Sequence, residues 1–526
     1  MSQLAYAPVL PDVPAPFPNL TPPPDIPLIA PPASAPKPIA APAQEIVAPK
    51  LAAFPQGDVD VIRDVIGQMR KGDVTAADAA IRRLSDPVAK GLGEWALIRS
   101  GLRTVSFNRI VEFIEKNPNW PTQSLMQRRA EEALAAEAKP SATVRAFFAQ
   151  RKPVTVVGRI ALARALLADK QRDDAFALIR AVWRDDNFSE ETENRIAAEF
   201  AEALRREDHR ARMERYIFKE EMGKALRAAT RAGADYVALL KARQAVEDKA
   251  KNAKALIDAV PKALHSDSSY VFARTQFARR SDQAAEAVKA MEGVSRDPAV
   301  LVDGDEWWVE RRLIARKLLD AGDAKLAYKA AAEHGASSDA MRVEAEFHAG
   351  WIALRFLNDP KLASTHFDKA AQSASMPMSV SRVAYWQGRT AEARGDAASA
   401  ETYYRKAASF SGFFYGQLAR AKLPGDADAT MTTASISRGE QNAVENDAAL
   451  RAINLLLTVD ARDLAMSMIV DLARESGAPA QISALGDLLT SRRDARAVLI
   501  LGKLAMQRGV SVERHAFPTI GIPTYQ

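Results

Sequence analysis

Cysteine is absent from the 526 residues, so disulfides, thiolate nucleophiles and cysteine-based metal sites are excluded. This absence leaves both a periplasmic and a cytoplasmic location open. Histidine is scarce, and no two histidines have HxxxH spacing on one helical face, so we predict no metal site and no cofactor. The six are His209, His265, His334, His348, His366 and His515.

Long apolar runs and phosphate-binding loops are also missing. The run Val498–Leu501 is soon broken by Lys503, and no stretch reaches the roughly 18 apolar residues of a membrane helix. Residues 1–10 lack the basic and apolar parts of a standard secretory signal. Gly91 and Gly93 lack the third glycine of a dinucleotide fingerprint. The sequence therefore predicts no integral membrane segment, shows no export signal and gives no support for nucleotide chemistry.

Net charge is small. Lys plus Arg exceed Asp plus Glu by 72 − 66 = 6, which describes a mildly basic, solvated surface on a chain of this size. We therefore predict no nucleic-acid partner.

Proline is concentrated at the start of the chain. Residues 1–55 hold 16 of the 29 prolines and no glycine. Proline fixes φ and removes a backbone donor, so we predict a disordered, extended tether over residues 1–55. A proline-motif ligand for a partner is the alternative, although no basic anchor flanks a clear PxxP site.

From Asp58 onward the apolar residues fall at helical spacing, and a repeat emerges from self-comparison. The residues Phe347, Gly350 and Ala353 align with Tyr385, Gly388 and Ala391, and Ala363, Phe367 and Ala370 align with Ala400, Tyr404 and Ala407. The period is 37 to 38 residues. A weaker unit precedes them, in which Ala321–Asp323 corresponds to Arg394–Asp396.

Small residues at fixed positions allow paired helices to approach, and one aromatic side chain per unit fills the space to the next pair. We predict an all-α superhelix of tetratricopeptide-like helical hairpins over residues 56–425, with curvature that permits a ring. The polar segment 426–442 is predicted to be a linker. A small helical domain is expected over residues 443–510, and residues 511–526 are expected to be an extended connector.

Two clusters carry side chains that sugar-cleaving or sugar-binding proteins use. Acidic residues flank Trp307 and Trp308, and four aromatic residues crowd a short segment with Gly412 and Gly416. We interpret the first cluster as a capped helix start with a buried apolar stripe, and expect Arg311 and Arg312 to pair with acids or extend to water. The second we interpret as the hydrophobic closure of the last hairpin. The clusters are Asp303, Asp305, Glu306 and Glu310, and Phe410, Phe413, Phe414 and Tyr415.

Six short segments carry a likeness to a known family. They are Phe113–Pro121, Arg128–Glu131, Ala161–Leu167, Ala384–Arg389, Phe414–Ala419 and His515–Pro518. Their order over residues 58–526 resembles the non-catalytic part of the soluble lytic transglycosylases, which cleave the glycan strands of bacterial peptidoglycan.

The resemblance implies a ring-like superhelical domain over residues 58–424 and a small helical linker domain over residues 443–508. The lysozyme-like catalytic domain of the family is expected to be missing, with residues 515–526 similar to the connector that leads into it. The family's Gly-Leu-Met-Gln and Ala-Tyr-Asn-Ala-Gly motifs do not occur here. Glu475–Ser476 is the one Glu-Ser pair, but the helix-stop residues Gly477–Pro479 follow it, so we assign no catalytic residue.

The family reaction is the non-hydrolytic cleavage of MurNAc–GlcNAc bonds by a glutamate general acid/base, without a metal, giving 1,6-anhydromuramyl ends. The resemblance implies a periplasmic protein that guides or holds glycan strands, alongside cell-wall protein partners, and that is inactive by itself. No residue is assigned to substrate binding. The alternative is a stand-alone helical-repeat adaptor that binds proteins.

Overall fold

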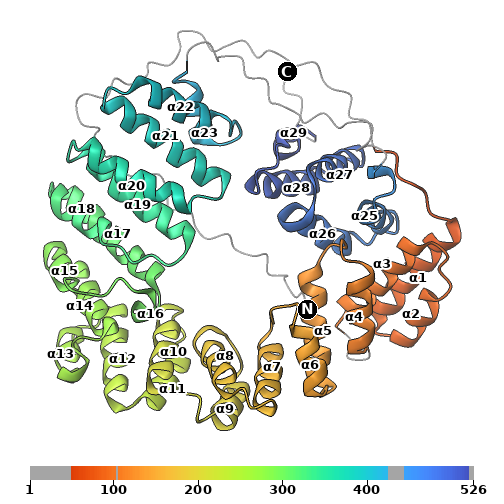
Figure 1. Cartoon of the computed structure of the whole chain (residues 1–526), viewed down its shortest axis with the longest axis horizontal. Helices are drawn as coiled ribbons and strands as arrows, with labels where there is room; N and C mark the ends of the chain where they lie inside the picture. Colours follow the sequence, from red (N-terminus) through yellow and green to blue (C-terminus); the bar gives the residue numbers. More distant parts are fainter. Residues whose placement is uncertain (1–48, 102–104, 424–442, 521–526) are drawn as a thin grey trace. The chain divides into compact units, whose positions relative to one another are not determined.

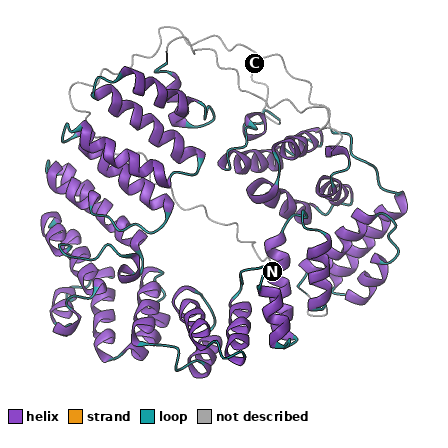
Figure 2. Ribbon diagram, in the orientation of Figure 1, coloured by secondary structure: helices purple, strands orange, loops and turns teal. Residues whose placement is uncertain are grey.

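The computed structural model describes residues 49–101, 105–423 and 443–520, and every regular element in these ranges is helical (Figure 2). None of these helices is long and apolar enough to cross a membrane. The fold is an all-α superhelix of helical hairpins, as predicted. The predicted linker 426–442 and residues 521–526 lie outside the described residues.

The helices follow one another as labelled in Figure 1. The first group comprises α1 (Gln56–Lys71), α2 (Val74–Ile81), α3 (Pro87–Arg99), α4 (Phe107–Lys116), α5 (Gln123–Ala136), α6 (Ser141–Phe148), α7 (Val156–Ala168), α8 (Arg172–Asp185), α9 (Glu190–Glu199), α10 (Arg206–Phe218), α11 (Met222–Ala232), α12 (Ala234–Glu247), α13 (Ala253–Asp258) and η1 (Lys262–Leu264). The second comprises α14 (Ser268–Arg280), α15 (Ala284–Ala290), α16 (Pro298–Leu301), α17 (Gly304–Asp320), α18 (Ala324–Ala332), α19 (Asp339–Arg355), α20 (Pro360–Ser373), α21 (Pro377–Ala393), α22 (Ala397–Ala408) and α23 (Phe414–Arg420). The last comprises α25 (Ala448–Thr458), α26 (Arg462–Asp471), η2 (Leu472–Ser476), α27 (Pro479–Ser491), α28 (Ala495–Gln507) and α29 (Glu513–Ala516).

The turns between these paired helices share one backbone geometry, in which a residue with positive φ is followed by a capping aspartate. Gly322 and Gly395 adopt φ values of 83° and 76°, and Asn358 takes the same place with φ 52°. An aspartate follows each of them and accepts a hydrogen bond from the backbone N–H three residues later, which caps the second helix. The three bonds are Asp323 with Leu326 at 3.0 Å, Asp359 with Leu362 at 2.8 Å, and Asp396 with Ser399 at 3.0 Å.

The predicted repeat positions form the contacts within each hairpin. A Cβ at Gly350 would lie 3.0 Å from Cζ of Phe367, and one at Gly388 would lie 2.6 Å from Cε1 of Tyr404. Phe367 and Tyr404 are buried, whereas Tyr403 is partly exposed, as the repeat predicts. Glycine on the first helix thus makes room for the ring of the second.

The last helices contact both the first part of the array and its end. Helix α25 packs against α3, and α28 contacts α21. Arg451 of α25 forms an ion pair with Asp86 at 2.7 Å, and Asp471 accepts a hydrogen bond from the backbone N–H of Thr122 at 2.7 Å. We call the contacts between residues 49–122 and 443–476 the joint.

Two stretches differ from the extended structures predicted for them. The backbone of Ala52 donates to the carbonyl of Glu445 at 3.0 Å and accepts from Arg451 at 3.1 Å. Residues 49–55, predicted to belong to the tether, are therefore attached to the helical body. Residues 513–516 form the short helix α29, in which buried His515 bonds to Asp487 at 2.9 Å. Non-local partners outweigh the local proline and glycine signals in both stretches.

Candidate functional site

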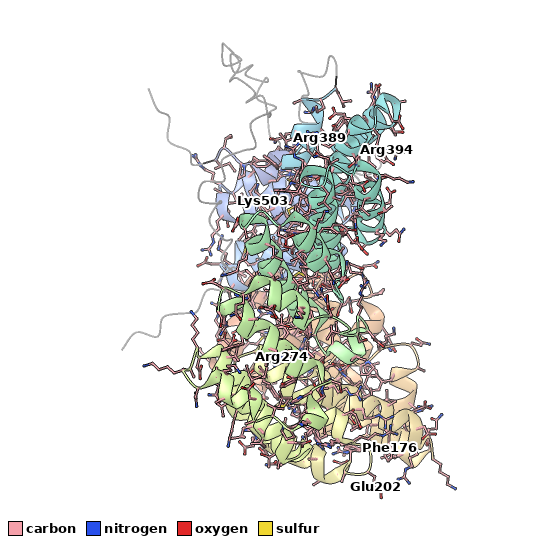
Figure 3. All side chains as sticks on the ribbon, turned by 90° about the vertical axis from the view of Figure 1, so that its left-hand side faces the viewer. Phe176, Glu202, Arg274, Arg389, Arg394 and Lys503 are labelled. Atoms are coloured by element: carbon pink, nitrogen blue, oxygen red, sulfur yellow. The ribbon has the colours of Figure 1, made fainter. Side chains whose placement is uncertain are left out.

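One stripe of α21 combines cations with an aromatic ring. Arg382, Trp386 and Arg389 follow each other at i, i+4 and i+7, which places them on one face of the helix, and all three are partly exposed. Figure 3 labels Arg389 on α21. Helix α21 begins at Pro377, whose fixed φ and missing N–H suit a first helical position.

Trp386 belongs to a continuous series of ring contacts across α17, α19, α21 and α23. Each ring lies within edge-to-face or tilted contact of the next, a geometry that aromatic pairs favour. The centroid distances are 5.3 Å for Trp308–His348, 5.4 Å for His348–Phe347, 5.9 Å for Phe347–Trp386, 5.9 Å for Trp386–Tyr385, 5.5 Å for Tyr385–Tyr415 and 5.2 Å for Tyr415–Phe414. We call these seven side chains the aromatic ladder.

The ladder runs from the core to the surface. Trp308 is fully buried, Phe347 and Trp386 are partly exposed, and Phe414 is 67% exposed. The predicted closure of the last hairpin is therefore only partly correct, because Phe414 buries little. Phe413 precedes α23 and has extended backbone, whereas Phe414 and Tyr415 are successive helical residues that point about 100° apart. The three side chains therefore do not share one face. Phe413 packs against the core that includes α25–α28, and Tyr415 packs against Tyr385.

Arg382 lies on the ladder without an acidic partner. Its guanidinium stands 4.7 Å from the ring centroid of Phe347, and among the described residues no carboxylate lies within ion-pair distance of it. Burial lowers the pKa of Arg382. Arg389, in contrast, pairs with Glu392 at 3.1 Å and lies 6.0 Å over Trp386. The stripe offers one partly exposed ring, Trp386, for stacking and one cation, Arg382, for an anionic or hydroxyl group.

The acidic cluster at residues 303–310 is structural, as interpreted. Asp303 caps α17 by accepting two backbone N–H bonds at 3.1 Å, and Asp305 accepts from Ser337 and Ser338. Glu310 pairs with Arg279 at 2.5 Å. Burial and the neighbouring aspartates raise the pKa of Glu306. Trp307 and Trp308 are buried. Because three of the four acidic residues are engaged in these bonds, the cluster offers no open pair of carboxylates for sugar cleavage.

The expectation for Arg311 is wrong, whereas that for Arg312 is confirmed. Arg312 pairs with Glu344 of the next hairpin. Arg311 is 3% exposed and donates to the carbonyl of Ala330 at 3.2 Å. Burial lowers the pKa of Arg311 to about 10. What covers this face of α17 depends on the packing of its partner helix α18, which the sequence spacing did not reveal.

Two of the scattered histidines meet at one carboxylate. His334 and His366 bond the two oxygens of Glu346 at 3.2 Å and 2.5 Å, and the hydroxyl of Tyr328 bonds His366 at 2.8 Å. Burial alone would raise the pKa of Glu346, but the two histidine bonds outweigh it and lower the pKa to about 2.

The remaining histidines have separate surroundings. His348 packs against Trp308, His209 packs against Trp183, and His265 stacks on Tyr270. Burial lowers the pKa of His348 to about 4. No group of three or more metal-ligating side chains is found within the described ranges.

Glu475 lies in η2, a short π-helical turn that ends before Gly477. Its side chain is exposed, and α27 begins anew at Pro479. This geometry agrees with the helix-stop reading of Glu475–Pro479. The i, i+4, i+7 stripe of α21 was readable from the sequence, but Trp386 was noted only as part of the family-like segment Ala384–Arg389.

No family model and no curated protein sequence match this chain. Solved structures of lytic transglycosylases do resemble it. An inactive mutant of the lytic transglycosylase Slt from Pseudomonas aeruginosa superposes with a TM-score of 0.60 at 16% identity, covering 88% of this chain and 73% of that one. The 70-kDa soluble lytic transglycosylase in complex with bulgecin A gives a TM-score of 0.49 at 14% identity, with 88% and 72% covered. The likeness to the Slt structure establishes the fold.

Proposed function

We propose that this chain is the non-catalytic superhelical portion of a periplasmic peptidoglycan lytic transglycosylase and that it holds glycan strands. The observation that carries the proposal is the fold likeness to Slt over 88% of the chain. The six sequence segments that resemble the same family are spread from α4 to α29, which adds support.

The aromatic ladder is the surface that we assign to the glycan. Sugar rings present flat faces of C–H groups that pack on aromatic rings, and Phe347, Trp386 and Phe414 all have exposed area. Carboxylates and hydroxyls on a peptidoglycan strand would accept hydrogen bonds from Arg382, which has no acidic partner among the residues that the structure describes. A face of this composition favours a polymer of sugars over an apolar partner.

Co-sedimentation with purified peptidoglycan tests the proposal. We expect Phe414→Ser combined with Arg382→Gln to weaken binding by at least about tenfold, because the double variant removes one stacked ring and one charge-assisted hydrogen bond. Phe356→Ser is the matched control, because Phe356 is also an exposed phenylalanine, 43% exposed, but contacts Trp351 outside the ladder.

Three results would count against the proposal. Absence of binding by the unaltered chain would favour a protein-binding adaptor instead. Equal losses of peptidoglycan binding in the double variant and in Phe356→Ser would show that the aromatic ladder is not the glycan-binding surface. Release of anhydromuropeptides by the chain alone would contradict its non-catalytic role.

A further inference from the structure

A second candidate site lies in the joint, away from the aromatic ladder. A cavity of about 810 Å³ opens between the loop after α4 and the helices α25, η2 and α27. Residues from both sides line it, among them Asn117, Trp120, Asp471, Glu475 and Gln481. Its size falls within the range of small-molecule pockets.

The charge of the lining is predominantly negative. Asp447, Asp471 and Glu475 contribute carboxylates, and Lys116 is the one lysine or arginine among the residues that line the cavity. Lys116 is engaged by Glu112, which lies outside the lining, at 2.5 Å. Asp447 accepts hydrogen bonds from Leu450 and Gln481 at 2.8 Å and 2.9 Å, and Asp471 accepts from Thr122 and from the side chain of Ser476. Of the three carboxylates, Glu475 therefore has the most capacity to spare.

Asp471 and Glu475 lie one helical turn apart and repel each other. Burial raises the pKa of Asp471, and the neighbouring charge of Glu475 raises it further. Together they outweigh the hydrogen bonds from the backbone N–H of Thr122 and from the side chain of Ser476, which lower it. Within the part of the chain that the structure describes, neither carboxylate has a cationic side chain within ion-pair distance. A ligand cation would relieve this repulsion.

Trp120 supplies an independent indication of a ligand. It lines the cavity and is 5% exposed, yet its indole Nε1 has no hydrogen-bond partner. The far edge of its benzene ring faces Gly91 of α3, which does not line the cavity, so the N–H edge is turned away from α3. In contrast, Nε1 of nearby Trp95 donates to Thr122 at 2.8 Å. Four other tryptophans also have an unpaired Nε1, namely Trp183, Trp307, Trp308 and Trp386. Trp120 is the one of these five that lines the cavity, where a ligand oxygen would satisfy its donor.

We propose that this cavity binds a ligand that carries an ammonium group beside oxygen acceptors, the chemistry of a non-acetylated amino sugar. Asp471 and Glu475 receive the ammonium group, and Trp120 donates to a ligand oxygen. The side chains of Asn117 and Gln481 line the same cavity. Their amide nitrogens already donate to Phe113 and Asp447 at 2.9 Å each, so their carbonyl oxygens are the groups that they offer to ligand hydroxyls. This site shares no residue with the aromatic ladder, so it does not depend on the proposed glycan-holding function.

Calorimetric titration with two matched disaccharides tests the proposal. The β-1,4-linked glucosamine disaccharide carries ammonium groups, whereas its N,N′-diacetyl counterpart has the same rings without the charge. We expect the charged disaccharide to bind at least about tenfold more tightly, the effect of one charge-assisted hydrogen bond. Glu475→Gln should remove most of this preference, and because Glu475 is exposed the variant should keep the fold.

The control variant is Glu115→Gln, which removes an exposed carboxylate of α4 outside the cavity lining. It should leave the affinity unchanged. Equal affinity for both disaccharides, binding that Glu475→Gln does not alter, or no binding of the charged disaccharide would each overturn the proposal. Peptidoglycan co-sedimentation depends on other residues, so failure here leaves the outcome of that assay unaffected.

Discussion

In the two hairpins α19–α20 and α21–α22, each helix packs against the helix next to it in the sequence. The joint, in contrast, brings together residues more than 300 positions apart. The hairpins pack through glycine and alanine against Phe367 and Tyr404. The joint adds polar contacts at specific atoms, including those of Arg451 with Asp86 and Asp471 with Thr122. The packing within the hairpins recurs with the sequence repeat. Each polar contact of the joint, in contrast, is made by one particular pair of residues.

The two hairpins also differ from each other. Both place an aromatic ring against a glycine, but α19–α20 adds the bonds of Glu346 with His334 and His366. The position equivalent to Glu346 in α21 is Ala384. The repeat therefore fixes the packing, while a buried polar cluster can be present in one unit and absent from the next.

The largest effect is expected for Tyr404→Ala, which should destabilise the protein by about 3–5 kcal/mol because it empties a packed position. Tyr404→Phe keeps the ring and should change stability by less than about 1.5 kcal/mol. Hydrogen exchange should show the loss of protection confined to residues 345–420, since each hairpin leans on its neighbours. Uniform loss along the chain, or an equal effect of Tyr403→Ala, would contradict the repeat assignment.

A smaller effect is expected for Glu346→Gln, at about 2–3 kcal/mol near neutral pH. The folded pKa of Glu346, about 2, lies below its ordinary value of 4.5. Its contribution is therefore fully present above about pH 4.5 and is lost as the pH falls towards 2. Denaturant titrations between pH 7 and pH 3 should show the difference between the two proteins shrinking as acid is added. A constant difference would show that the ionised carboxylate is not the source of the stability.

The smallest effects are expected at the joint. Arg451→Met removes a mostly buried pair with Asp86 and the bond to Ala52, and should cost about 1–3 kcal/mol. Arg70→Met removes the exposed pair with Asp463, also across the joint, and should cost about 0–1 kcal/mol. Chemical denaturation measures both. Equal costs for the two variants would show that the joint is not held through Arg451.

The sequence predicts the turns and the packing positions of the hairpins better than it predicts which side chains the neighbouring helices bury. The turn residues Gly322 and Gly395 and the small positions Gly350 and Gly388 were readable because their signals lie within one repeat. The exposure of Phe414 could not be predicted from the sequence, because it depends on which faces of α23 the neighbouring helices cover. The burial of Arg311 was missed for the same reason, because α18 supplies the carbonyl that it bonds.

By itself the sequence determined the all-α class, the hairpin repeat and the burial of Tyr404, because helical periodicity and small-residue spacing act over fewer than 40 residues. Only the tertiary structure decided that residues 49–55 attach to Glu445 and Arg451, that His334 and His366 share Glu346, and that Trp120 and Glu475 line one cavity. Such contacts depend on how successive hairpins rotate and stack, and small rotations accumulate along a superhelix in a way that no local pattern records.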